Sequence, residues 1–137
     1  MLPALALALC LPACAARPAD TVPEGGAATG GITPTDGDLT VELDRGDGSV
    51  VQRWTLLCGV TPQGTHPAAH EACAHLRGMD DPFAPIPDDM MCTQEYGGPQ
   101  TAHITGRWAG EPVDLRLARN DGCRIAQWKG LGPLLPA

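Results

Sequence analysis

The stretch CGVTPQGTHPAAHEACAHL, residues 58–76, joins a predicted strand to a predicted helix and carries a cysteine on each. Residues 61–67 are predicted to form a loop, and Pro67 suits the first turn of a helix, where its missing N–H needs no partner. Four small or apolar side chains then recur at helical spacing: Ala69, Ala72, Cys73 and Leu76. They form one apolar stripe, small enough to let the helix lie close to a sheet. Gly78 is a natural stop just beyond it.

Strand patterns lie on both sides of this helix. Residues 39–43 alternate apolar and polar side chains, and 113–117 do so most clearly. Residues 44–48 predict a turn that joins 39–43 to 50–58 as a hairpin. The complete set of expected strands is 39–43, 50–58, 101–108, 113–117 and 123–128. The expected fold is therefore α+β, a five-stranded antiparallel sheet with one or two helices packed on one face.

The first residues are typical of an export signal. Residues 1–15 hold an apolar run followed by small residues, and the run is too short for a permanent membrane span. Leu11-Pro12-Ala13-Cys14 also resembles a bacterial lipobox, in which Cys14 becomes lipidated. Residues 16–38 are rich in Pro, Gly, Ala and Thr and predict a flexible linker. The folded domain is expected at 39–137, in a secreted or extracytoplasmic protein. Lipidation of Cys14 would anchor it to the outer face of the membrane.

Composition excludes several classes of function. The chain has 137 residues and a net charge of −7, and Lys129 is its only lysine. A nucleic-acid-binding protein needs a basic stripe, and none is visible. The sequence has no Ser-His or Cys-His signature of a hydrolase. We therefore expect neither an enzyme nor a cofactor.

Four cysteines lie in the predicted domain: Cys58, Cys73, Cys92 and Cys123. Four cysteines allow three pairings, and spacing alone does not choose among them. A zinc site is a lesser alternative, built from His66, His70, Cys73 and His75. It lacks the Cys-x-x-Cys spacing typical of such sites, so no metal is predicted.

Three segments resemble the Streptomyces subtilisin inhibitor family. CGVTPQGTHPAAHEACAHL is similar to its signature region, in which Gly-Thr-His-Pro lies between two cysteines. MMCTQEYGGP, residues 90–99, resembles its reactive-site segment. TGRWAGEPVDLRLARNDGC resembles its Gly-x-Trp-x-Gly hairpin and the region that follows. The resemblance covers about residues 39 to 128.

The resemblance implies two disulfides, Cys58–Cys73 and Cys92–Cys123. It implies an inhibitor of serine endopeptidases, more of the subtilisin than of the trypsin type. The reactive bond would be Gln94–Glu95, with Gln94 entering the protease's primary specificity pocket. The flanking contacts would come from Met91, Cys92, Thr93 and Tyr96. The family implies a homodimer through the sheet face away from this segment.

The reactive-site segment departs from the family pattern. Gln94 stands where Met or Lys is familiar, and Glu95 replaces a small apolar residue. We expect packing of Tyr96 to hold the leaving side of the bond, and Gly97-Gly98 to loosen it, because glycine raises loop entropy. These departures keep open a second hypothesis, a non-inhibitory cell-envelope binding module on the same fold.

Overall fold

The computed structural model describes residues 35–136. The predicted export signal, Cys14 and most of the predicted linker lie outside the described residues. Within them, no helix is long and apolar enough to cross a membrane.

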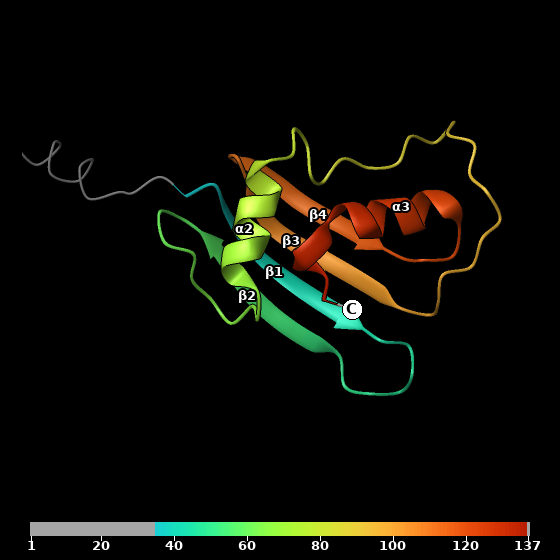
Figure 1. Ribbon diagram of the computed structural model, residues 1–137, viewed down its shortest axis with the longest axis horizontal. Coiled ribbons are helices and arrows are strands. Elements are labelled where there is room, and N and C mark those ends of the chain that lie inside the picture. The colour runs from blue at the N-terminus through green and yellow to red at the C-terminus, as the bar shows by residue number, and fades with distance from the viewer. Residues whose placement is uncertain (1–34, 137) are drawn as a thin grey trace, which may run out of the picture. The chain divides into compact units, whose positions relative to one another are not determined.

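Four antiparallel strands form one sheet (Figure 1). They are β1 (Gly37–Asp44), β2 (Gln52–Cys58), β3 (Thr101–Trp108) and β4 (Glu111–Leu117), in the order β2-β1-β3-β4. Val41 pairs with Trp54 on one side and with Ile104 on the other. In this register, the apolar residues of the alternating strand patterns all lie on the same face of the sheet, as the sequence predicted. Strand β1 begins at Gly37, two residues before the predicted domain start.

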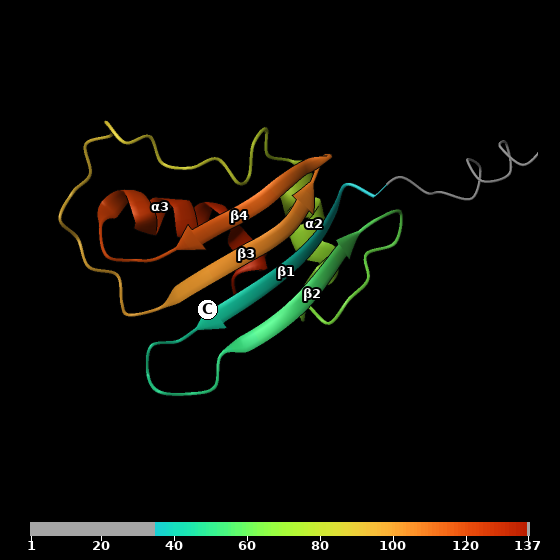
Figure 2. The ribbon, with the colours of Figure 1, turned by 180° about the vertical axis from the view of Figure 1, so that it is seen from behind.

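Both α-helices found in residues 35–136 cover that face. They are α2 (Ala69–Arg77) and α3 (Gly122–Gly130), and the short 3-10 turn η1 (Gly132–Leu134) follows α3. Figure 1 shows them in front of the sheet, and Figure 2 shows the opposite face of the sheet without a helix on it. The fold is thus a two-layer α+β arrangement, as expected.

The predicted fifth strand, residues 123–128, is wrong, because this segment is helix α3. The Asp121 carboxylate caps the helix by accepting a hydrogen bond of 2.8 Å from the Arg124 backbone N–H. Ile125 and Trp128 lie three residues apart on its inward side. Asn120-Asp121-Gly122, a sequence that is typical of turns, therefore begins a helix here rather than a hairpin.

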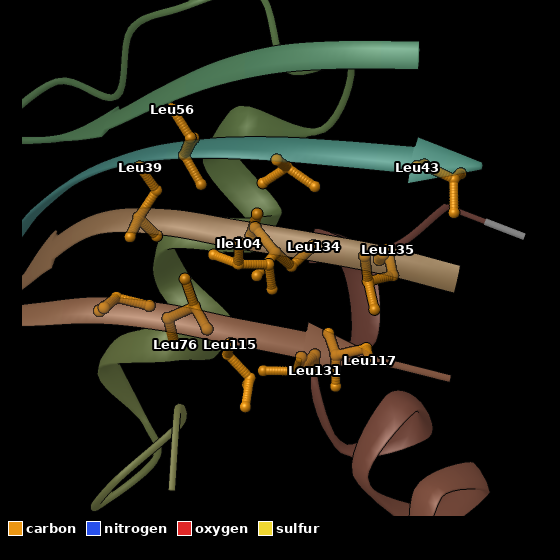
Figure 3. Close-up of a cluster of buried hydrophobic side chains, with 14 of the residues drawn as sticks. Leu39, Leu43, Leu56, Leu76, Ile104, Leu115, Leu117, Leu131, Leu134 and Leu135 are labelled. Atoms are coloured by element: carbon orange, nitrogen blue, oxygen red, sulfur yellow. The ribbon is translucent and has the colours of Figure 1, made fainter. Parts of the chain in front are cut away.

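The core fills the space between the sheet and the helices (Figure 3). The sheet supplies Leu39, Leu43, Leu56 and Ile104, and α2 supplies Leu76. The chain after α3 adds a further buried group: Leu131, Leu134 and Leu135. Each such leucine stabilises the fold by roughly 1.5–3 kcal/mol. The leucine-rich C-terminal segment is thus part of the core. Trp54 and Trp108 lie half-buried at the margin of the core, on the covered side of the sheet.

The Gly-Thr-His motif fixes the loop between β2 and α2. Gly64 approaches β2 so closely that an added Cβ would lie 2.3 Å from the Thr55 carbonyl oxygen. The Thr65 hydroxyl accepts a hydrogen bond of 3.0 Å from the Thr55 N–H, and the Thr65 N–H donates to the Thr55 hydroxyl at 3.2 Å. Buried His66 accepts at Nδ1 from the Ala68 N–H and donates from Nε2 to the Leu134 carbonyl at 2.9 Å. One motif thereby orders the loop and ties down the C-terminal segment.

The disulfide Cys58–Cys73 joins the end of β2 to α2, with 5.5 Å between its Cα atoms. Both cysteines are fully buried. The second disulfide is Cys92–Cys123, so the predicted pairing is confirmed. In the chain-entropy model, loops of these sizes give roughly 3–4 kcal/mol each.

Candidate functional site

Residues 90–99 form an extended segment between α2 and β3, outside any helix or strand. In Figure 1 the chain here rounds the end of α3 before it enters β3. Met91 is 95% exposed and Tyr96 is 72% exposed. Thr93, Gln94 and Glu95 between them are exposed as well. The residues predicted for the reactive site are therefore consecutive along an extended segment that faces solvent.

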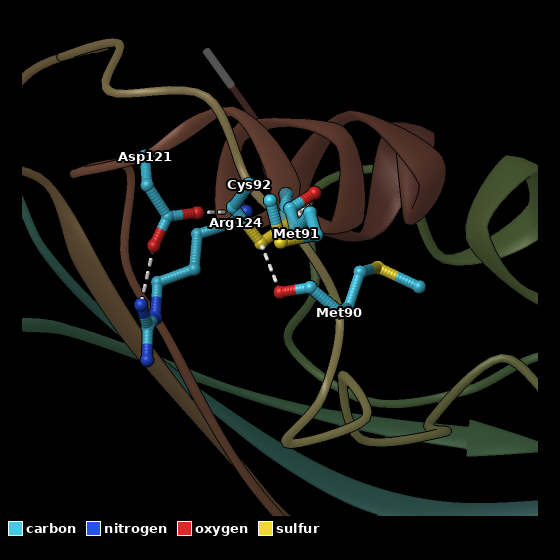
Figure 4. A network of polar contacts seen from close by, with 6 residues as sticks. Met90, Met91, Cys92, Asp121 and Arg124 are labelled. Carbon is cyan, nitrogen blue, oxygen red and sulfur yellow. Dashed lines mark hydrogen bonds and ion pairs between the residues drawn. A yellow bond between two sulfur atoms is a disulfide. The ribbon is translucent and has the colours of Figure 1, made fainter.

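The Cys92–Cys123 disulfide fastens the near side of this segment to the start of α3 (Figure 4). The two Cα atoms are 5.3 Å apart. One residue further on, the Gly122 N–H donates a hydrogen bond of 3.0 Å to the Thr93 carbonyl. The sulfur of Cys92 also lies 3.6 Å from the Met90 carbonyl oxygen. This sulfur carries no hydrogen, because it belongs to the disulfide. The backbone is thus fixed directly before Gln94.

The far side is fixed by a backbone hydrogen bond from the Gly97 N–H to the Arg119 carbonyl, 2.6 Å long. A Cβ added to Gly97 would lie 2.8 Å from Cγ1 of Ile125 on α3. Tyr96 is exposed, so the expectation that its packing holds this side is wrong. The expected loosening by Gly97-Gly98 stays a prediction; at Gly97, the lack of a side chain permits close approach to α3.

Residues 119–124 form the support beneath the segment. The Arg119 guanidinium lies over the Trp128 ring, 5.8 Å from its centre, and Nη1 donates to Gln100 Oε1 at 3.2 Å. The Arg124 guanidinium forms an ion pair with the Asp121 carboxylate (Figure 4). The Arg124 backbone N–H and then its side chain hold the pKa of Asp121 below its usual value. Charge and capping together stabilise the first turn of α3, where the disulfide is attached.

A side-chain hydrogen bond spans the central residue of the segment. The Thr93 hydroxyl donates to Glu95 Oε2 at a distance of 2.7 Å. Both groups lie against Gly122, where an added Cβ would be 1.9 Å from Thr93 Oγ1 and 2.9 Å from Glu95 Oε2. Sequence analysis missed this pairing and the roles of Arg119 and Gly122. The one sequence feature that could have predicted this support is Asn-Asp-Gly-Cys, in which Asp121 is a suitable residue to cap the start of a helix.

Metal binding finds little support among the described residues. The ligand atoms of Cys92, Asp121 and Cys123 lie within 4.8 Å of one another, but both sulfurs belong to the disulfide. In the alternative zinc cluster, Cys73 is bonded to Cys58. His66 and His75 bind the carbonyls of Leu134 and Gly130.

The uncovered sheet face is polar. His103 lies between two carboxylates, with Nε2 at 2.7 Å from Asp114 Oδ1 and Nδ1 at 3.8 Å from Glu42 Oε2. The hydrogen bond from His103 lowers the pKa of Asp114. Glu42 also forms an ion pair with Arg53 on the neighbouring strand. A hollow of about 530 Å³ opens beside these residues, near Arg116 and Arg124.

The chain is similar to known protease inhibitors. A family described as "Subtilisin inhibitor-like" matches residues 33–119. Subtilisin inhibitor-like protein 3 of Streptomyces coelicolor is 50% identical over 71 residues, covering 50% of this chain and 65% of that protein. Protease inhibitor SIL-V2 of Streptomyces orinoci is 37% identical over 91 residues, covering 62% and 83%. The chain spans 60 to 65% of the length of two of its curated relatives.

One solved structure, Streptomyces caespitosus sermetstatin in complex with Bacillus licheniformis subtilisin, has 23% sequence identity and a TM-score of 0.49. The likeness covers 74% of this chain and 98% of that one. The family match includes all four strands, α2 and the whole of segment 90–99. On that match, the chain belongs to the subtilisin inhibitor-like family.

Proposed function

We propose that this protein inhibits serine endopeptidases of the subtilisin type and has no catalytic activity of its own. The proposed reactive bond is Gln94–Glu95, with Met91, Cys92, Thr93 and Tyr96 as the flanking contacts. The observation that carries the proposal is the fixed, exposed segment: a disulfide and two backbone hydrogen bonds hold an extended stretch whose centre faces solvent.

Such a segment can bind as a substrate does. An extended backbone adds to the protease's substrate-binding strands through main-chain hydrogen bonds. Because the disulfide and α3 already hold the backbone in place, little conformational entropy is lost on binding. Shape and preorganisation therefore favour tight binding.

The same anchors oppose hydrolysis. The protease serine attacks the Gln94 carbonyl, and the bond to the Glu95 nitrogen breaks. The new amine stays beside the acyl group, because Gly97 remains bonded to Arg119. A reactant held in this way has a very high effective concentration, so resynthesis of the peptide bond competes with attack by water. The inhibitor is released slowly and mostly intact.

Gln94 determines which proteases are inhibited. A trypsin-like pocket with a buried carboxylate selects Lys or Arg, and the amide of Gln94 cannot satisfy that charge. A wide subtilisin-like pocket accepts an uncharged polar chain. We therefore expect weaker binding to trypsin than to subtilisin.

Location and assembly complete the proposal. The protein is secreted or extracytoplasmic, where its two disulfides persist. The export signal lies within residues 1–15, and lipidation of Cys14 is the proposed anchor to the outer face of the membrane. The proposed homodimer forms through the uncovered sheet face, in which charges of both signs lie next to one another.

The second candidate is a cell-envelope binding module without inhibitory activity. Glu95 favours it, because a negative charge directly after the reactive carbonyl is unfavourable for many serine proteases. In this case the exposed segment contacts a partner that does not cut it.

Titration of the purified protein into subtilisin and into trypsin separates the two candidates. We expect stoichiometric loss of subtilisin activity, with at most a slow and reversible cut at Gln94–Glu95. The Gln94→Lys variant should shift inhibition toward trypsin, whereas Gln63→Lys adds the same charge outside the segment and should not. Rapid conversion to the cut form, or no loss of activity with either protease, would assign the binding-module function.

A further inference from the structure

The side chains of Thr93 and Glu95 are joined by a hydrogen bond across Gln94. They flank Gln94, and side chains two residues apart on an extended chain point the same way. The hydroxyl-to-carboxylate distance is 2.7 Å. This contact closes a ring around the Gln94 residue and the bond that follows it, while the Gln94 side chain remains exposed.

The start of α3 supports this ring. The Gly122 N–H binds the Thr93 carbonyl at 3.0 Å, so the backbone and the side chain of Thr93 are both restrained. An atom added at the Gly122 Cβ position would be only 2.9 Å from Glu95 Oε2, so the carboxylate lies against the N-terminal turn of the helix. A negative group is favoured there by the helix dipole. The Glu95 charge is therefore directed toward the protein's own helix.

We propose that Thr93 and Glu95 form a positioning pair that holds the Gln94–Glu95 peptide for resynthesis and slows its hydrolysis. This inference rests on the proposed inhibitory function. It gives Glu95 a favourable effect on inhibition, whereas its negative charge alone is unfavourable for many serine proteases. The carboxylate acts through its hydrogen bond to Thr93. After cleavage, the same bond links the acyl side to the new amine side without passing through the broken peptide bond.

The pair makes a prediction that is independent of any protease. In the intact protein, the γ-methyl group of Thr93 is rigid because its side chain is fixed by Glu95. Side-chain NMR relaxation should give a high order parameter for this methyl in the wild type. Glu95→Ala should lower it clearly, and Glu95→Gln, which keeps an acceptor oxygen, should retain most of it. Glu111→Ala, an exposed glutamate on β4, is the matched control.

The second measurement is the rate at which subtilisin hydrolyses the Gln94–Glu95 bond within the complex. A hydrogen bond to a charged group predicts an increase of about tenfold for Thr93→Val and for Glu95→Ala. The double variant should be no faster than the faster single variant, because the two residues act as one unit. Glu95→Gln should remain closer to the wild type than Glu95→Ala does. Thr101→Val on β3 controls for the change of residue type.

The two measurements separate the two ideas. If subtilisin is not inhibited at all, the proposed function fails, and the relaxation experiment still tests the pair. Equal rigidity of the Thr93 methyl in the wild type and Glu95→Ala would overturn the pair. So would equal hydrolysis of the Glu95→Ala and Glu95→Gln variants, since the charge alone would then explain the effect.

Discussion

The Gly97 backbone N–H donates a hydrogen bond of 2.6 Å to the carbonyl oxygen of Arg119. This contact lies on the leaving side of the proposed reactive bond. On the other side, the Gly122 N–H binds the Thr93 carbonyl. The segment is therefore held at both ends by the short stretch that connects β4 to α3 and by the first residue of α3 itself.

Substitution of Gly97 tests the leaving-side contact. Gly97→Ala places a methyl group 2.8 Å from Ile125 Cγ1, so the segment must move away from α3 and lose the bond to Arg119. We expect faster hydrolysis of Gln94–Glu95 by subtilisin, by about tenfold. The control is Gly130→Ala, whose added methyl meets nothing within 4 Å. Equal hydrolysis of both variants would show that the leaving side needs no such contact.

His66 tests the connection between the signature motif and the C-terminal segment. His66→Ala removes a buried donor and acceptor and leaves the Leu134 carbonyl without its partner. We expect a loss of about 2–3 kcal/mol in the free energy of unfolding, measured by urea denaturation.

His70 provides the comparison for that measurement. It lies on α2, four residues after His66, and is exposed, so His70→Ala should change stability by no more than about 0.5 kcal/mol. A similar small change for His66→Ala would contradict the role given to the buried imidazole.

Asp121 makes stability depend on pH in acid. Its pKa is lowered in the folded protein by the Arg124 backbone N–H and then by the Arg124 side chain. A depressed folded pKa means that the stabilisation is present above the unfolded value of 3.8 and is lost as pH falls through the lower folded value. We expect Asp121→Asn to flatten the pH dependence of unfolding below about pH 4. If the Asp121→Asn variant lost stability in acid as the wild type does, Asp121 would not be the source of this pH dependence.

The homodimer can be tested by one charge reversal. Glu42 lies on the uncovered face, between Arg53 and His103. Glu42→Lys should weaken a dimer formed through this face at least about tenfold, as measured by sedimentation equilibrium. Glu71→Lys on α2 makes the same change in net charge on the other side of the sheet. Identical behaviour of the two variants, or a monomer throughout, would exclude this interface.

Sequence patterns predicted four strands and α2 because the apolar side chains of each segment recur at the spacing of a strand or of a helix. The prediction for residues 123–128 failed because their apolar side chains fit neither spacing clearly, and the cap at Asp121 resembles a hairpin turn. Spacing left three disulfide pairings open, and only the family resemblance chose among them. The contacts of Gly97 with Ile125 and of Thr93 with Glu95 depend on tertiary packing, which no local pattern encodes.

In the proposed mechanism, anchoring turns a cleavable segment into an inhibitor. The direct test is the hydrolysis rate of Gln94–Glu95 by subtilisin after removal of the Cys92–Cys123 disulfide. The control is Cys58→Ala with Cys73→Ala, which removes a disulfide of comparable expected stability, roughly 3–4 kcal/mol, and leaves the segment anchored. With both variants shown to be folded by circular dichroism, we predict that Cys92→Ser with Cys123→Ser is hydrolysed about 100-fold faster than the wild type. Hydrolysis at the wild-type rate in that variant would contradict the account.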